Sequence, residues 1–415
     1  MLLAIWMSMA SAEALFIHSH VHPPHPPPDT RPRAEVESRS LEDAAFNDPW
    51  THDNRRTALD DSMIYRIKSR AEESAIRAGS SNPLPRLTPL SDAHFNVPFF
   101  VYDEVDWMST KCDGITISGQ ENDYHKHSDD FWFLKAALNH GMRTKDPKKA
   151  RLFVVPALLN LAVEQSVWSR RQCCVGGLCN LDFFQHANDM LNESIWFKRN
   201  KGKDHVVVCS HYACLNHLVL FENLVKCNSI SFEENSMRQE RCRIAGTYVG
   251  QRCEHMPKQT MFTLIASMHR RRPNFQSRRD ICKWFPHLVS VNQTYNVSIC
   301  GAGRQCPSLA QARFSPHVRG DTWGSSRLID IVLSGAVPMF TNTIQYQILP
   351  PFVPWESIST QIDVSDKQRF ELSVQDSVPL YDGLKQKVDK HAHHLDWETP
   401  APFEQYMWLF QQCIR

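Results

Sequence analysis

The fold of this chain is indicated most clearly by one stretch, Phe314-Ser315-Pro316-His317-Val318-Arg319-Gly320-Asp321-Thr322-Trp323-Gly324-Ser325-Ser326-Arg327-Leu328-Ile329-Asp330-Ile331-Val332-Leu333-Ser334-Gly335-Ala336-Val337-Pro338-Met339-Phe340. It predicts a loop, a helix, a tight turn and a strand. Ser325 is a favourable helix N-cap, and Gly335 suits the left-handed residue that follows a helix. The five residues from Ala336 to Phe340 then form a short apolar strand.

The predicted helix has two different faces. Leu328, Ile331 and Val332 follow the i, i+3, i+4 spacing of a face that packs on a sheet. Arg327 and Asp330 are three residues apart and share another face near the helix start. An ordinary Arg–Asp surface pair would show the same spacing, so a binding role needs further support.

The start of this helix is a candidate binding site for a diphosphate. A helix N-terminus presents unpaired backbone N–H groups and partial positive charge. Arg327 would add a bidentate donor, and Asp330 would accept hydrogen bonds from ribose or sugar hydroxyls. The candidate binding residues are Gly320, Asp321, Ser325, Ser326, Arg327 and Asp330.

Elsewhere, apolar runs of strand length alternate with longer amphipathic stretches. We expect strands at 97–102, 152–155, 205–209, 261–266 and 336–340, and helices at 130–139, 182–191, 278–285 and 326–334. Strand and helix in alternation predict an α/β fold with parallel sheets covered on both faces.

The composition divides the chain into regions. We expect a signal peptide or truncated signal anchor at 1–12, a Pro-rich stem at 13–92, two α/β domains at 93–250 and 251–370, and a helical tail at 371–415. The first run is too short to span a bilayer, which takes about 20 apolar residues. A buried N-terminal helix is the alternative. With 46 basic and 45 acidic residues, the charge does not indicate a nucleic-acid partner.

Cysteines and sequons favour an oxidising, lumenal compartment. All 13 cysteines lie at or after Cys112, which favours disulfides over zinc ligation because paired C-x-x-C units are absent. The odd number leaves at least one thiol outside any internal pair. Asn192, Asn292 and Asn296 are candidate glycosylation sites.

The quoted stretch resembles the signature of exostosin-like glycosyltransferases, which include animal heparan-sulfate synthase relatives and plant and algal cell-wall enzymes. The matching positions are Gly320-Asp321, Ser325-Ser326-Arg327, Asp330 and Gly335-Ala336-Val337-Pro338-Met339, where Ala336 replaces the usual Cys. Three further elements match in order: the stretch from Arg143 to Pro156, the stretch from Gly202 to Val208, and Leu349-Pro350-Pro351-Phe352 with Trp355.

The resemblance implies two Rossmann-like domains facing a cleft, the GT-B type of glycosyltransferase fold, preceded by a disordered stem. It implies a nucleotide-sugar donor, a UDP-sugar in our interpretation, held by the second domain, and a polysaccharide or glycoprotein glycan as acceptor. It also implies a place in the Golgi lumen, or in the Golgi membrane if the anchor is longer. A homodimer or heterodimer is compatible with it.

The remaining site predictions concern charge and proton transfer. No Asp-x-Asp occurs, so we expect transfer without a cofactor or metal, with positive side chains meeting the diphosphate charge. Arg270, Arg271 and Arg272 follow a predicted strand and are candidates for this, although such a triplet also occurs in solvated loops and sorting signals.

Inverting transfer also requires a base. The candidates are His211, Asp129 and Asp130, which lie past a strand or at a helix start, where capping and core roles are common. Two other readings stay open: an inactive lumenal scaffold or partner subunit, and another two-Rossmann enzyme. The latter would require a Gly-x-Gly-x-x-Gly, which Gly301-Ala302-Gly303 does not complete.

Overall fold

The computed structural model describes Pro89 and residues 95–414, except 103–104, 114–125, 170, 233–241, 251, 255, 269–274, 293–294, 302, 304–305 and 321. The chain divides into two units, Met1–Ser80 and Ser81–Arg415, and the description below concerns the second. The predicted signal segment lies outside the described residues, as does the predicted stem apart from Pro89.

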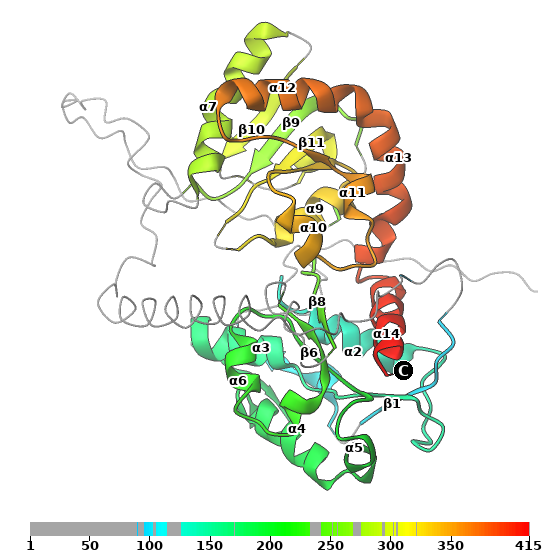
Figure 1. Ribbon diagram of the computed structural model, residues 1–415. Coiled ribbons are helices and arrows are strands. Elements are labelled where there is room, and N and C mark those ends of the chain that lie inside the picture. The colour runs from blue at the N-terminus through cyan, green and yellow to red at the C-terminus, as the bar shows by residue number, and fades with distance from the viewer. Residues whose placement is uncertain are drawn as a thin grey trace, which may run out of the picture. The chain divides into compact units, whose positions relative to one another are not determined.

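The first sheet has five parallel strands in the order β1-β3-β6-β7-β8 (Figure 1). These strands are β1 (Phe99–Val101), β3 (Leu152–Val154), β6 (His205–Cys209), β7 (Asn228–Ser231) and β8 (Arg243–Ala245). Every residue of β3, β6 and β7 is buried, as expected of strands covered on both faces.

The connecting helices of this sheet are α2 (Asp129–Asn139), α3 (Leu159–Val163), α4 (Asp182–Glu193), α5 (Ile195–Asn200) and α6 (Cys214–Leu218). A π-helical segment, Glu164–Ser169, continues directly from α3. A small antiparallel sheet is formed by β2 (Lys111–Cys112), β4 (Cys173–Val175) and β5 (Leu178–Cys179).

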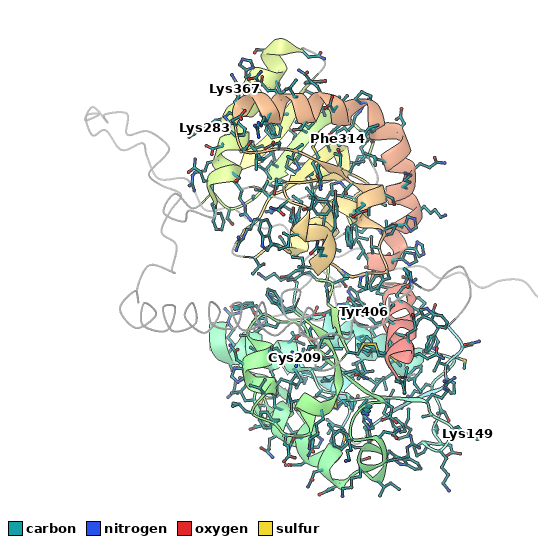
Figure 2. The ribbon with its side chains drawn as sticks, in the orientation of Figure 1. Lys149, Cys209, Lys283, Phe314, Lys367 and Tyr406 are labelled. Atoms are coloured by element: carbon teal, nitrogen blue, oxygen red, sulfur yellow. A yellow bond between two sulfur atoms is a disulfide. The ribbon has the colours of Figure 1, made fainter. Side chains whose placement is uncertain are left out.

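The second sheet also has five parallel strands, in the order β10-β9-β11-β12-β13. They are β9 (Thr260–Ile265), β10 (Val297–Gly301), β11 (Ala312–His317), β12 (Val337–Phe340) and β13 (Thr360–Gln361). Its helices include α7 (Gln276–Val291), α8 (Ser308–Gln311), α9 (Ser326–Leu333), α10 (Ile344–Ile348), α11 (Trp355–Ile358), α12 (Lys367–Ser377) and α13 (Tyr381–His391). Figure 2 labels Phe314, a buried residue of β11, and Cys209 at the end of β6.

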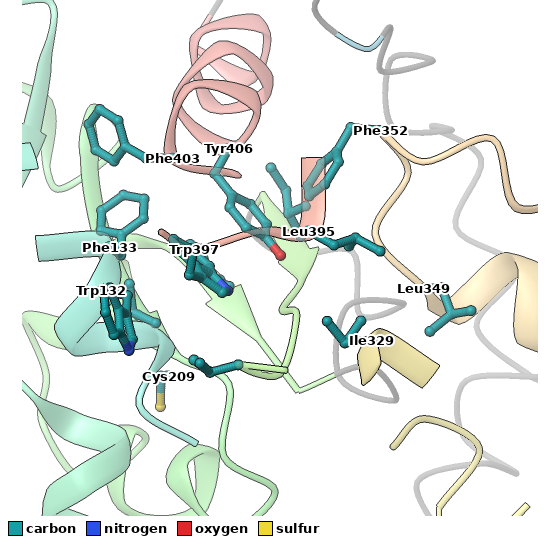
Figure 3. Packing of buried hydrophobic residues seen from close by; sticks show 14 of the residues in the cluster. Trp132, Phe133, Cys209, Ile329, Leu349, Phe352, Leu395, Trp397, Phe403 and Tyr406 are labelled. Carbon is teal, nitrogen blue, oxygen red and sulfur yellow. The ribbon is translucent and has the colours of Figure 1, made fainter. Parts of the chain in front are cut away.

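The last helix, α14 (Ala401–Cys413), packs against the first sheet and α2. The ring of Phe403 lies 4.9 Å from that of Phe133 (Figure 3). It also lies 5.3 Å from the ring of Phe99. The Tyr406 hydroxyl donates to the carbonyl of Ala245 at 2.9 Å. The C-terminal segment follows the second sheet in the chain, and it completes the core of the first sheet.

Six disulfides confirm the predicted oxidised cysteines: 112–173, 174–179, 209–214, 242–413, 253–306 and 282–300. The remaining cysteine, Cys227, is buried and outside any disulfide. The zinc alternative fails for the crowded loop, because Cys173 and Cys174 each have a disulfide partner.

All five predicted strands and all four predicted helices form, with ends shifted by a few residues. The two parallel sheets confirm the predicted α/β class with two Rossmann-like units. Across the described ranges, no helix is both long and apolar enough to cross a bilayer.

Candidate active site

The start of α9 has the predicted cap. Ser325 Oγ accepts a hydrogen bond from the Arg327 backbone N–H at 3.2 Å, and the Leu328 N–H donates to the Ser325 carbonyl at 3.0 Å. Ser325 and Ser326 are half-buried, so both hydroxyls lie near the surface. Gly335 ends the helix with a φ of +67°, the left-handed conformation that its position predicted.

Arg327 points inward from α9 and is 6% exposed. Its Nη1 donates to the Ile265 carbonyl at 3.3 Å, and its Nη2 donates to the Val318 carbonyl at 2.9 Å. Ile265 is the last residue of β9, and Val318 directly follows the last residue of β11. Both Nη atoms of the guanidinium thus donate to backbone carbonyls. Only the buried Nε has no hydrogen-bond partner among the described residues. Burial, with the charge of Arg278 nearby, lowers the Arg327 pKa to about 9.

Arg278 is a second buried arginine at this edge, and our sequence analysis did not select it. Its three guanidinium nitrogens donate to the carbonyls of Arg319, Ser267 and Val318, at 3.1, 3.1 and 3.4 Å. It lies in the first turn of α7, where a positive side chain is disfavoured by the helix dipole. That unfavourable placement was the available signal in the sequence.

Gly320 fits this arrangement for a steric reason. A Cβ at Gly320 would lie 2.5 Å from Arg278 Nη2. The glycine therefore lets the loop after β11 lie directly against the Arg278 guanidinium.

His317 and Arg319 complete the carboxyl end of β11. His317 Nε2 donates to the Trp323 carbonyl at 3.1 Å, which leaves Nδ1 as a buried acceptor with no partner in the described structure. Burial and the charges of Arg327 and Arg278 lower the His317 pKa to about 3, so the imidazole is neutral. Arg319 is half-buried, and its guanidinium lies 4.5 Å from the centre of the Trp323 ring.

Asp330 is 3% exposed, and its negative charge acts on Arg327 by raising the arginine pKa, against the effects of burial and Arg278. A Cβ at Gly250 would lie 2.5 Å from Ile329 Cγ2 and 3.2 Å from the Asp330 backbone nitrogen. The segment that joins the two sheets therefore runs directly against α9.

Four predicted donor-site residues, Arg270, Arg271, Arg272 and Asp321, lie outside the described residues. Their roles remain predictions.

Asp129 and Asp130 belong to a buried hydrogen-bond network. Both are buried at the start of α2, and their oxygens accept hydrogen bonds from Asn160, Ser210 and nearby backbone N–H groups. Burial raises the Asp129 pKa to about 7, and burial together with the Asp129 charge raises the pKa of Asp130 well above its usual value. Both residues are almost fully buried, and a role as base remains a prediction for each.

His211 is also enclosed, and its Nε2 lies 2.8 Å from Glu164 Oε2. Glu164, at the start of the π-helical segment, is 19% exposed in its side chain, whereas that of His211 is 0% exposed. The structure thus brings together one predicted candidate and one carboxylate that our sequence analysis missed. No local motif marks Glu164, because its partner lies 47 positions away.

The family model of the exostosin GT47 domain matches residues 63–374, most of the chain. The chain belongs to the exostosin GT47 family. A search of curated proteins finds no match. Among solved structures the chain resembles the crystal structure of TarM at 9% identity and a TM-score of 0.32. That match covers 58% of this chain and 61% of TarM.

One matched element of this exostosin chain serves the core. Asp204 Oδ1 lies 2.8 Å from His205 Nδ1, and His205 Nε2 lies 2.8 Å from the Tyr102 hydroxyl. All three side chains are buried at the beginning of β6. The segment from Gly202 to His205 therefore fixes the beginning of β6, which is the end of the strand away from Glu164.

The three sequons of this exostosin chain differ in their surroundings. Asn192 is exposed on α4, and Asn292 is half-buried. Asn296 is exposed, yet its Nδ2 donates to the Gln259 carbonyl at 2.8 Å. Glycosylation at each remains a prediction.

A pocket of about 400 Å³ lies at the opposite end of the second sheet, and it is lined partly by Lys258, Thr260, Asn292, Asn296 and Arg313. Thr260 and Arg313 stand at the beginnings of β9 and β11. Ligands of parallel α/β sheets bind beyond the carboxyl ends of the strands. Pocket size alone therefore does not locate the donor site.

Proposed function

We propose that this exostosin chain transfers a sugar from a UDP-sugar to a hydroxyl of a polysaccharide or glycoprotein glycan, with inversion and without a metal. The observation that carries this proposal is the convergence of Arg278, Arg319 and Arg327 at the carboxyl end of β11. Such an edge is where a nucleotide binds in parallel α/β sheets.

The electrostatics of this edge favour a bound anion. Arg278 and Arg327 both donate to the Val318 carbonyl, so two positive charges share one acceptor. The Nε atoms of Arg319 and Arg327 are buried and have no hydrogen-bond partner among the described residues. A diphosphate near these groups would reduce the repulsion between the arginines and stabilise the leaving charge.

The side chains have separate roles in this proposal. Arg278 and Arg327 hold the ends of β9 and β11 and supply positive potential from below the surface. We assign contact with the diphosphate to Ser326 and Arg319, because both are half-buried and nearer the surface than Arg278 and Arg327. This differs from the bidentate contact first expected of Arg327, whose two Nη atoms already donate to carbonyls.

The disulfides indicate an oxidising lumen. Within that setting, we propose the Golgi lumen, with a nucleotide-sugar donor and a glycan acceptor as partners. The same proposal includes a membrane anchor, if the N-terminal segment is longer, and a homodimer or heterodimer.

The test is a donor screen that scores release of UDP from UDP-sugars, with matched arginine variants of the chain. Arg313 lies at the beginning of β11 and Arg319 lies just past its end. The Arg319 guanidinium is 4.5 Å from the centre of the Trp323 ring, and that of Arg313 is 5.3 Å from the centre of the Tyr381 ring. Arg319→Ala should weaken donor binding about tenfold or more, because one charged hydrogen bond contributes about 1.5–3 kcal/mol. Arg313→Ala should change it by less than about twofold.

Equal donor affinity in Arg319→Ala and wild type would contradict the donor site. Absence of any calorimetric heat with all UDP-sugars would instead favour the inactive scaffold. EDTA should leave most of the activity in place. Complete loss of activity in EDTA would contradict transfer without a metal.

A further inference from the structure

A cluster of His127, Glu164 and His211 lies at the carboxyl ends of β3 and β6. One possible ligand atom from each residue lies within 4.8 Å of the others. The rings of His127 and His211 are 4.5 Å apart in an edge-to-face arrangement. Two imidazoles and one carboxylate can hold a metal ion or can activate a hydroxyl, and the hydrogen bonds distinguish these roles.

The His211 tautomer is fixed by its two neighbours. Its Nδ1 accepts the Ala213 backbone N–H at 3.1 Å, so Nδ1 carries a lone pair. The proton of the neutral ring is then on Nε2, which donates to Glu164 Oε2 at 2.8 Å. His211 thus has no ring nitrogen available as a base.

The same tautomer disfavours a metal. A histidine that binds a metal through Nε2 donates its Nδ1–H to an acceptor. Here Nδ1 faces an N–H donor, so metal binding would require loss of the Ala213 hydrogen bond. The cluster is better described as a carboxylate that an imidazole holds in place.

A buried network holds the imidazole. The His211 backbone N–H donates to Asn160 Oδ1 at 2.9 Å, and Asn160 Nδ2 donates to Asp129 Oδ1 and Ser210 Oγ, both at 2.8 Å. Asn160 lies in α3, which leads directly into Glu164. The carboxylate and its histidine are therefore fixed by one set of side chains, as a catalytic group requires.

The cluster is connected to the proposed donor site by a short segment. The Val249 N–H donates to the carbonyl of Lys126, the residue before His127, at 3.1 Å. The next residue, Gly250, lies directly against Ile329 of α9. Residues 248–250 thus contact both the histidine cluster and the helix that bears Ser326.

We propose that Glu164 is the general base of the transfer and that His211 is its positioning residue. This rests on the proposed function. The Glu164 carboxylate takes the proton of the acceptor hydroxyl while that oxygen forms a bond to C1 of the donor sugar. The bond between C1 and the diphosphate oxygen breaks, and its electron pair leaves with UDP. The His211 Nε2–H keeps the carboxylate oriented.

The test uses the full chain and the UDP-sugar that wild type hydrolyses fastest, with water as the acceptor. Glu164→Gln should lower kcat by about 100-fold or more, the usual contribution of a general base. Its donor Kd, measured by calorimetry, and its melting temperature should stay close to wild type. Glu222→Gln is the matched control, since Glu222 is exposed and pairs only locally with Lys226.

The positioning role of His211 has its own pair of variants. His211→Gln retains an N–H donor toward Glu164, so its kcat should exceed that of His211→Ala, with equal donor Kd in both. Equal kcat in the two would contradict the positioning role.

Two results would overturn the proposal. Donor binding with undiminished hydrolysis in Glu164→Gln would exclude Glu164 while leaving the donor site intact. Stoichiometric binding of Zn²⁺ or Mn²⁺ that restores activity after EDTA, and is lost in Glu164→Gln, would make the cluster a metal site. If the wild-type chain binds no UDP-sugar, the result counts against the proposed function instead.

Discussion

Gly320→Ala tests the packing on which the donor site depends. The added Cβ would lie 2.5 Å from Arg278 Nη2, so the guanidinium must move by about 1 Å to reach an ordinary contact distance. Its hydrogen bonds to Ser267 and Arg319 are each 3.1 Å long, and such a shift breaks at least one. We expect a loss of about 1–3 kcal/mol in the free energy of unfolding and weaker donor binding.

The assay is urea unfolding of Gly320→Ala, alone and in an Arg278→Ala background. Removal of the guanidinium removes the collision, so the glycine substitution should then cost less than about 0.5 kcal/mol. Gly141→Ala is the control, because nothing lies within 4 Å of its added Cβ. An equal cost of Gly320→Ala in both backgrounds would refute the reasoning.

Three further predictions concern stability. Burial raises the Asp129 pKa to about 7, so its contribution is fully present below about pH 4, the usual range of an unfolded Asp, and is lost as the pH rises through 7; Asp129→Asn should flatten this part of the pH profile in urea unfolding, and an unchanged slope would oppose the assignment. Phe403→Ala should lower the free energy of unfolding by about 3–5 kcal/mol, whereas Leu372→Ala, at a residue that is 53% exposed, should have little effect; similar Tm losses in the two variants would contradict this. Replacing Cys242 and Cys413 by Ser should cost about 2–4 kcal/mol by opening a loop of 171 residues, and an unchanged urea midpoint would argue against that disulfide.

The parallel sheets could be predicted because their central strands are continuous apolar runs. The run from His205 to Cys209 and the stretch around α9 show this. Strands β7 and β8 were not predicted, because Asn228–Ser231 is polar in sequence yet fully buried. Burial there comes from its neighbours in the sheet, and tertiary context overrides residue propensity in strands.

The candidate site was only partly predictable for a related reason. The cap at Ser325 and the turn at Gly335 are local, and the structure contains both. One partner of Arg327, the Ile265 carbonyl, lies 62 positions away, and Glu164 lies 47 positions from His211, so no local pattern specified these contacts. The sequence predicted the helix that starts near Ser326, whereas only the fold could show that Glu164 lies beside His211.

The most direct test of the central claim is a crystal structure of the chain with UDP bound. We predict density for the diphosphate at the carboxyl end of β11, within hydrogen-bond distance of Ser326 and Arg319. Density in the pocket lined by Lys258 and Arg313, at the other end of the same sheet, would contradict the account.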